Sequence, residues 1–305
     1  MSTTPGPLCR KFVPIEQSEV TSISKPTGFK FSVVSYNMLA QAYVKRSVFP
    51  HSPAPCLKVL FPNHVNFFCF EIPISAEMII QETIDYNDLV NSVEDGEDLT
   101  VDKDESKAGS QLKEDHEDPN DPRVRLKRDC VGMMSAFRLK DTSSHHVIIA
   151  NTHLYWDPEW ADVKIAQAKY LLSRLAGFKE LVTNKFDCTP SIIVTGDFNS
   201  VPGDQVYQYL VSGTSLAGPE SADDLPMPLS SVYAFTRGEP EFTNCTPGFT
   251  GTLDYILFSP CGDLTPVSYL DLPGSESSDV IGGLPNYYHP SDHLPIGAEF
   301  EVDHV

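Results

Sequence analysis

The chain has 305 residues, of which 41% are apolar, and its formal net charge is -20. The length and apolar content allow a substantial core and exclude a wholly disordered chain. The negative charge argues against a broad basic surface for nucleic acid, because phosphate binding usually depends on Lys and Arg. However, the stretch from Glu94 to Asp121 alone contains twelve acidic residues and only three lysines. A site of carboxylates loaded with a divalent metal would also carry its own positive charge.

The seven cysteines form an odd set without a C-x-x-C motif, which is typical of reduced thiols in a cytosolic or nuclear chain. The first residues lack the apolar stretch of a signal peptide, and no apolar run is long enough to cross a membrane. We therefore expect a soluble protein of the cytoplasm, the nucleus or both, with no membrane partner.

Taken in chain order, residues 1–28 are rich in Pro, Ser and Thr and are predicted to form a flexible lead-in to one domain at 29–305. Residues 29–39 alternate and then become β-branched, which predicts a buried strand. Residues 91–122 have almost no apolar content and a high charge, so they are predicted to be a disordered acidic insertion, a solvated loop without function.

The remaining elements indicate an α/β fold with layered sheets and helices. A long helix is predicted to begin near Asp157 and Pro158, with an apolar stripe from Val163 to Val182 that serves packing. Further strands are predicted at 130–139, 145–154, 190–198, 251–259 and 294–302.

The stretch SIIVTGDFNS (191–200) is an apolar strand that ends in a carboxylate and an amide two residues apart. In an extended chain Asp197 and Asn199 point to the same face, so they are predicted to lie together at the rim of a sheet. Gly, Asp and Asn also favour turns, so an ordinary turn is the alternative interpretation.

Other predicted strands also begin or end at polar residues, namely Asn37, His153, Asp254 and the pair Asp292 and His293. Each has an ordinary explanation, such as a turn cap, a hydrogen-bonded core histidine or an ion pair. Because function in layered α/β proteins gathers where strand ends and loops meet, the set as a whole predicts one metal or phosphate site.

Five motifs carry a family resemblance: SYNMLA (35–40), ANTHLYWDPEW (150–160), GDFNS (196–200), TLDYI (252–256) and SDHLPI (291–296). Together they resemble the endonuclease/exonuclease/phosphatase superfamily and, within it, poly(A) deadenylases of the carbon catabolite repressor protein four group, plant homologues above all. The resemblance implies a two-sheet β-sandwich flanked by helices, the DNase I-like four-layer fold. It also implies hydrolysis of phosphodiester bonds at the 3′ ends of adenosine-rich single-stranded RNA, with Mg²⁺ or Mn²⁺ as cofactor.

The resemblance also implies roles for the residues at the strand ends. Asn37 and Asp292 would hold the metal, Asp197 and Asn199 would position the attacking water and the phosphate, His153 would bind the phosphate, and Asp254 would orient His293. These roles suit the chemistry, because Mg²⁺ prefers oxygen ligands and an aspartate fixes the tautomer of a histidine.

For the substrate, the resemblance implies that Pro158 and Phe249 form walls around an adenine, by stacking that accepts any base. The alternative is that Pro158 only starts a helix and Phe249 is only a loop aromatic. Trp156 and Trp160 are expected to serve packing. The chain has no leucine-rich repeats, so we expect no tether of that kind to a larger deadenylase complex.

The chain departs from the family pattern at residues 59–74, VLFPNHVNFFCFEIPI. The family continues here through a helix and a strand that ends in Leu-Gln-Glu-Val, whose Glu is the central metal ligand, so one helix and about two strands are predicted to be missing. Glu71 comes one residue early, and a one-residue slip turns a strand side chain to the opposite face unless a bulge restores it. Glu77 and Glu82 are weaker candidates. We expect a damaged sandwich with reduced catalysis.

Three hypotheses for function remain open at this point. The first is an impaired 3′ exoribonuclease, which would shorten labelled oligo(A) stepwise. The second is a phosphatase on a small nucleotide ester, which would release inorganic phosphate without shortening RNA. The third is a non-catalytic RNA-binding variant, which would shift oligo(A) in a gel without cleaving it.

Overall fold

The computed structural model describes residues 9–15, 28–39, 44–57, 76–90, 121–140, 144–212, 227–260 and 262–302. The departing segment at 59–74, Glu71 included, lies outside these residues, as does most of the predicted acidic insertion. What we predict for both segments therefore stays a prediction.

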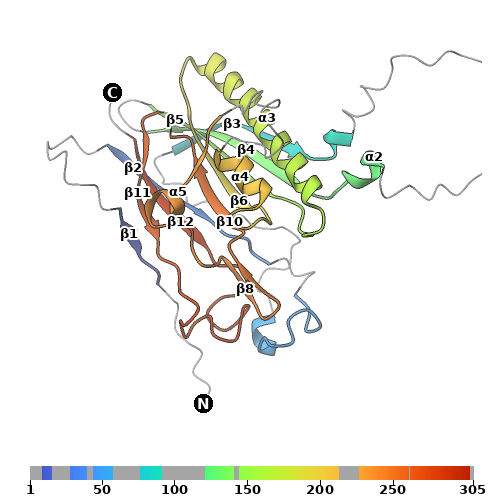
Figure 1. Cartoon of the computed structure of the whole chain (residues 1–305). Coiled ribbons are helices and arrows are strands. Elements are labelled where there is room, and N and C mark those ends of the chain that lie inside the picture. The colour runs from blue at the N-terminus through green and yellow to red at the C-terminus, as the bar shows by residue number, and fades with distance from the viewer. Residues whose placement is uncertain are drawn as a thin grey trace, which may run out of the picture.

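Two main β-sheets and a set of helices form the fold (Figure 1). The larger sheet has the order β3-β4-β5-β6-β10-β7, with strands β3 (Ala76–Asp85), β4 (Val131–Leu139), β5 (His146–His153), β6 (Ser191–Asp197), β10 (Asp254–Phe258) and β7 (Ser230–Ser231). The smaller sheet has the order β1-β11-β12-β2, with strands β1 (Phe12–Pro14), β11 (Leu264–Leu270), β12 (Ile296–Val302) and β2 (Phe29–Ser35). The hairpin β8 (Asn244–Thr246) and β9 (Phe249–Gly251) forms a third sheet. The helices are α2 (Pro122–Arg125), α3 (Ala161–Phe186), α4 (Gln205–Ser212) and α5 (Val232–Thr236), with a 3-10 turn η1 at Ala54–Leu57.

The central strands of the larger sheet are buried on both faces. In β5, Ile148 and Ala150 belong to the core shared with α3 and α4, whereas Val147 and Ile149 belong to the core shared with β2 and β12 of the smaller sheet. This alternation follows from the two-residue period of a strand. It explains why the central strands read as continuous apolar runs, and it confirms the two-sheet α/β sandwich flanked by helices.

Strand pairing places three polar side chains in one row across the larger sheet. Strand β5 runs parallel to β6, with His153 opposite Asp197, and β10 runs antiparallel to β6, with Asp254 opposite Asp197. All three residues follow the two-residue period of the strand positions that face the smaller sheet. The row therefore lies at the rim of the core between the two sheets.

Helix α3 begins at Ala161, after Trp160 as its N-cap residue, so the predicted start near Asp157 and Pro158 is wrong. The side chain of Asp157 instead accepts the backbone N–H of Glu159 at 2.9 Å, and its carbonyl accepts that of Trp160 at 3.2 Å. These bonds close a turn, a local alternative to helix that Asp favours. The predicted apolar stripe from Val163 to Val182 is buried against the larger sheet at most of its positions.

The strands predicted at 130–139, 145–154, 190–198, 251–259 and 294–302 correspond to β4, β5, β6, β10 and β12, and the strand predicted at 29–39 ends earlier, as β2. Within the lead-in predicted at 1–28, the three residues of β1 pair with β11. Part of this lead-in is therefore an edge strand of the smaller sheet, while the rest of the domain division stays a prediction.

None of the helices in the described part of the chain combines the length and the apolar character that a membrane crossing requires.

Candidate active site

The site is built around the end of β6. Gly196 has a φ of +140°, and a Cβ at this position would lie 1.9 Å from the carbonyl oxygen of Thr152 on β5. Only glycine allows the two strands to approach so closely here. The next residue, Asp197, is buried with 1% of its surface exposed.

After Asp197 the chain leaves the strand in a turn. Asp197 Oδ1 accepts the N–H of Asn199 at 2.9 Å, and Asn199 has a φ of +47°. The Asn199 side chain donates to the carbonyl of Leu154 at 2.9 Å. The expectation that Asp197 and Asn199 point the same way as strand neighbours is therefore wrong, because the strand ends at Asp197. The alternative interpretation, a turn, is the one that the structure shows, and this turn shapes the rim.

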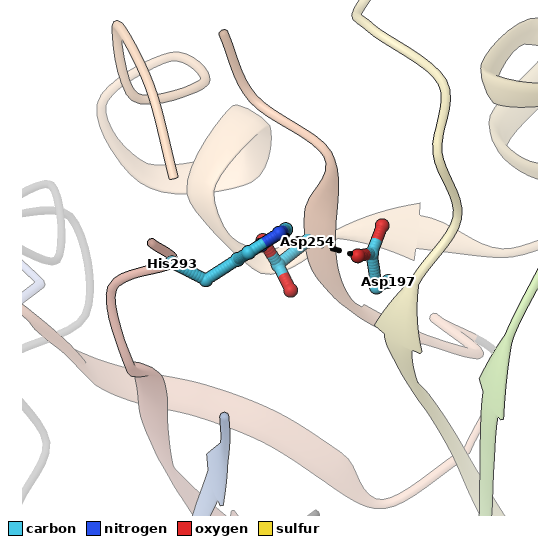
Figure 2. Close-up of side chains that lie close together, drawn as sticks. All are labelled: Asp197, Asp254 and His293. Carbon is cyan, nitrogen blue, oxygen red and sulfur yellow. Dashed lines mark hydrogen bonds and ion pairs between the residues drawn. The ribbon is translucent and has the colours of Figure 1, made fainter. Parts of the chain in front are cut away.

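One carboxylate oxygen, Asp197 Oδ2, forms the centre of the cluster. Asn37 donates its Nδ2 hydrogen to this oxygen at 2.7 Å, and the Nε2 atoms of His153 and His293 each lie 3.5 Å from it. Figure 2 shows Asp197 and His293 pointing toward one another, with Asp254 beside them. Residues far apart in the sequence thus converge on a single atom.

His293 is oriented by a buried aspartate. Its Nδ1 donates to Asp254 Oδ2 at 2.7 Å, since an ionised carboxylate can only accept. The same oxygen accepts from the hydroxyl of Thr243 at 2.6 Å, and that hydroxyl accepts the N–H groups of Leu253 and Asp254 at 2.9 and 3.1 Å. Thr243 is fully buried, and its one donor and two acceptor positions are all used.

The charge state of His293 follows from these neighbours. Burial lowers its pKa, but the carboxylates of Asp254 and Asp197 outweigh this effect and raise the pKa to about 10. Burial also raises the pKa of Asp254, and the adjacent imidazolium opposes that rise. At neutral pH the side chain of His293 is therefore an imidazolium within a cluster of carboxylates.

On the other side of the site, a hydroxyl joins Asn37 to Asp292. Ser291 Oγ donates to the carbonyl of Asn37 at 2.7 Å and accepts the N–H of Leu39 at 3.2 Å. Asp292 Oδ2 accepts from the amide of Asn244 at 3.3 Å. Asn37 and Asp292 therefore lie on two segments that one buried serine holds together.

A metal ion suits the donors at this rim. The possible ligand atoms of Asp197, Asp254 and His293 lie within 4.8 Å of one another, and all three residues are buried. Within this group, however, Asp254 Oδ2 is already engaged by His293 and Thr243, and a protonated His293 has no free nitrogen lone pair for a metal. The carboxylate of Asp292 and the amide oxygen of Asn37 add the hard oxygen donors that Mg²⁺ prefers. The residues present thus fit a divalent cation at the rim.

Of the residues predicted for the site, the structure brings together Asn37, His153, Asp197, Asn199, Asp254, Asp292 and His293. Pro158 is exposed on the loop after β5, and Phe249 is exposed on β9. Glu77 and Glu82 lie on β3, where they pair with Arg138 at 2.6 Å and Arg174 at 3.2 Å. Glu71 lies outside the described residues.

Four residues of the site were not singled out from the sequence: Lys164, Thr243, Asn244 and Ser291. Lys164 is 4% exposed, and its Nζ donates to the carbonyl of Asn199 at 2.7 Å. Burial lowers its pKa. Lys164 could have been identified from the sequence because it lies beside the apolar stripe of α3, and lysine is seldom buried without a partner.

Comparison with known proteins gives the family. The model of the Endonuclease/Exonuclease/phosphatase family matches residues 136–293, about half of the chain, and includes His153, Asp197, Asp254 and His293. The chain belongs to this family. By family it is therefore a hydrolase.

Among sequence relatives, the chain is 50% identical to "Carbon catabolite repressor protein 4 homolog 4" of Arabidopsis thaliana, over 90% of this chain and 78% of that protein. This alignment runs over 329 residues, more than the 305 of the chain, so the relative has residues that this chain lacks. The chain is also 34% identical to the "CCR4-Not complex 3'-5'-exoribonuclease subunit Ccr4" of Candida albicans, over 58% of this chain and only 24% of that protein.

Among solved structures, the fold is similar to that of ANGEL2, described as a 2',3'-cyclic phosphatase, with a TM-score of 0.63 and 21% identity over 91% of this chain and 96% of that one. At this identity the likeness concerns the fold alone.

Proposed function

We propose that this chain is a 3′ exoribonuclease of the poly(A) deadenylase type, which hydrolyses phosphodiester bonds of adenosine-rich single-stranded RNA with Mg²⁺ or Mn²⁺. The observation that carries the proposal is the convergence of Asn37, His153 and His293 on Asp197 Oδ2. The name of the Candida relative, a 3'-5'-exoribonuclease subunit, supports the choice of RNA over other phosphoesters.

We assign the metal to Asn37 and Asp292. A bound divalent cation would supply Lewis-acid stabilisation of charge on the phosphoryl oxygens. Asn37 suits this role because its Nδ2 is held by Asp197, which fixes the direction of its amide oxygen. Asp292 suits it because Asn244 and the Ser291 segment limit its movement.

The remaining side chains divide the other tasks. Asp197 Oδ2, already surrounded by nitrogens, accepts a hydrogen bond from the attacking water and positions it. Asn199 uses one side-chain amide hydrogen on Leu154, and the other hydrogen of this amide would donate to the phosphate. The imidazolium of His293, oriented by Asp254, supplies positive charge where negative charge develops on phosphorus oxygens. His153, with 27% of its side chain exposed, contacts the phosphate.

For the substrate, we propose that Pro158 and Phe249 contact an adenine. Phe249 keeps 43% of its surface exposed, and Pro158 lies on the exposed part of the loop after β5. Such stacking accepts any base, so the preference for adenosine would need further contacts. We expect the protein to act on mRNA 3′ ends in the cytoplasm, the nucleus or both.

We also propose that activity is reduced in this chain. The departing segment at 59–74 replaces the part of the family pattern that carries the central metal-ligand Glu, and Glu71 is displaced from that position by one residue. Removing one ligating group from a metal site generally lowers metal affinity and catalysis together.

The proposal is tested by incubating the protein with 5′-labelled oligo(A) and Mg²⁺, with Asp197→Asn as the inactive control. Stepwise shortening that stops in the variant supports it. Release of phosphate from a small nucleotide ester without shortening would assign the chain to the phosphatase class instead. Binding without cleavage, where a hybrid carrying the additional residues of the Arabidopsis relative does cleave, would establish a non-catalytic variant.

A further inference from the structure

The loop that follows His153 is firmly attached to the site. The N–H of Leu154 donates to the carbonyl of Asp197 at 2.9 Å, and the Leu154 carbonyl accepts from Asn199 at 2.9 Å. The next N–H, of Tyr155, donates to the side chain of Gln167 on α3 at 2.9 Å. The backbone of this loop at Leu154 and Tyr155 is therefore held in place relative to the cluster around Asp197.

Beside this loop, guanidinium groups and aromatic rings alternate. Arg125 lies 4.1 Å from the ring centre of Trp160, and Arg128 lies 4.2 Å from that of Trp160 and 4.7 Å from that of Tyr155. Asp162 fixes Arg125 further, through two hydrogen bonds at 2.5 and 2.8 Å. These cation–π contacts stabilise the positions of Trp160 and Tyr155.

Trp156 is the exposed aromatic residue of this arrangement. Its ring centre lies 6.0 Å from that of Tyr155, and 66% of its surface is exposed, whereas Trp160 is half-buried. The expectation that both tryptophans serve packing is therefore wrong for Trp156. A single exposed apolar residue is common on protein surfaces. An exposed indole that contacts Tyr155, three residues from His153, is a more specific arrangement.

The overall charge explains why such a residue matters for an RNA substrate. A chain with a net charge of -20 has few cations to offer a phosphate backbone, and Arg125 is already neutralised by Asp162. Stacking between a base and an aromatic ring needs no net charge on the protein and is available to every base. An acidic enzyme can therefore bind single-stranded RNA by stacking where it cannot do so by charge.

We propose that Trp156 is a stacking platform for a base of the single-stranded RNA upstream of the scissile bond, distinct from the adenine contacted by Pro158 and Phe249. This inference rests on the proposed function, because it extends the substrate strand away from the same site. The stack of Arg125, Trp160, Arg128 and Tyr155 keeps the platform in place.

The first experiment uses fluorescence, because the chain has only two tryptophans. In Trp160→Phe, Trp156 is the sole reporter, and we expect oligo(A) of ten nucleotides with Mg²⁺ to quench its emission, while AMP does not. In Trp156→Phe the emission should change little. Binding of the same oligonucleotide is followed independently by the anisotropy of an attached dye.

The second experiment measures kinetics with Trp156→Ala, Trp156→Phe and the control Phe235→Ala. Phe235 is also an exposed aromatic residue, but it packs on Phe258. Phe258 is the last residue of β10, whereas Asp254 is the first. We expect Trp156→Ala to raise KM for long oligo(A) about tenfold, as for loss of one stacked base. The kcat of Trp156→Ala should be unchanged, and its rise in KM should persist at high salt. The KM of Trp156→Phe should be near normal.

The outcomes separate this inference from the proposed function. If oligo(A) quenches Trp156 but is never shortened, the stacking platform stands and the exonuclease proposal fails. If oligo(A) is shortened while Trp156 emission and the KM of Trp156→Ala stay as in the controls, the platform is overturned and the exonuclease proposal stands. Absence of oligo(A) binding by anisotropy overturns the platform as well.

Discussion

The two halves of the site are supported in different ways. In the relay half, Asp197 and Asp254 lie on β6 and β10, which have a hydrogen-bonded neighbour on each side, and Asp254 holds His293 from the segment before β12. The edge half, Asn37 and Asp292, follows β2 and precedes β12, and among the described residues β2 pairs with β12 alone. Two residues of the relay half thus lie in the centre of one sheet, whereas the proposed metal ligand Asn37 follows an edge strand and is joined to the Asp292 segment through Ser291.

The largest effect is expected from Asp197→Asn, which removes the centre of the relay half. Loss of a positioned carboxylate should lower kcat/KM on oligo(A) by about a thousandfold. The asparagine has nearly the same shape, so circular dichroism should show a folded protein. Asp271→Asn, in an exposed ion pair with Arg237, is the matched control and should retain full activity. Equal activity in the two variants would contradict the role of Asp197.

Ser291→Ala tests the edge half. Without its hydroxyl, the Asn37 carbonyl and the Leu39 N–H lose their common partner, and the proposed metal ligands lose their mutual position. We expect Mg²⁺ affinity, measured by calorimetry, to fall about tenfold, as for other groups that orient metal ligands. A variant whose Mg²⁺ affinity matches that of the parent would show that Ser291 does not support the metal site.

Thr243→Val makes the equivalent change in the relay half. It removes a hydroxyl that serves Asp254 and two backbone N–H groups in a fully buried place, so the free energy of unfolding should fall by about 1 to 3 kcal/mol. In contrast to Ser291→Ala, Mg²⁺ affinity should change little. Urea unfolding with calorimetry on both variants distinguishes the halves, and a reversed pattern would refute the division.

The last prediction concerns pH. The pKa of His293 rises from an ordinary 6.5 to about 10 on folding, so its contribution to stability is complete below about pH 6.5 and is lost as the pH rises toward 10. The urea midpoint should decline over this range in the parent protein. Asp254→Asn removes the carboxylate bound to Nδ1 and should flatten the decline. An equally steep decline in this variant would show that a group other than the His293–Asp254 pair causes it.

Much of this fold could be predicted from the sequence, because apolar runs such as 190–198 mark strands that are buried on both faces. The polar residues that interrupt or end these runs, such as His153 and Asp254, were visible for the same reason. Thr243 and Ser291 could not be predicted, since a hydroxyl becomes important only through neighbours distant in the sequence. The start of α3 was missed because the Asp157 side chain closes a turn before the helix instead of capping it.

The row formed by His153, Asp197 and Asp254 has a consequence for assembly of the larger sheet. Strands with two apolar faces gain nearly as much from burial when they pair one residue out of place, so hydrophobicity alone specifies their alignment weakly. Such a slip in β10 would turn Asp254 toward the helices, into an apolar layer where a carboxylate without partners is costly. The side chains proposed for catalysis therefore favour the correct strand alignment, because a misaligned pairing would bury them without partners.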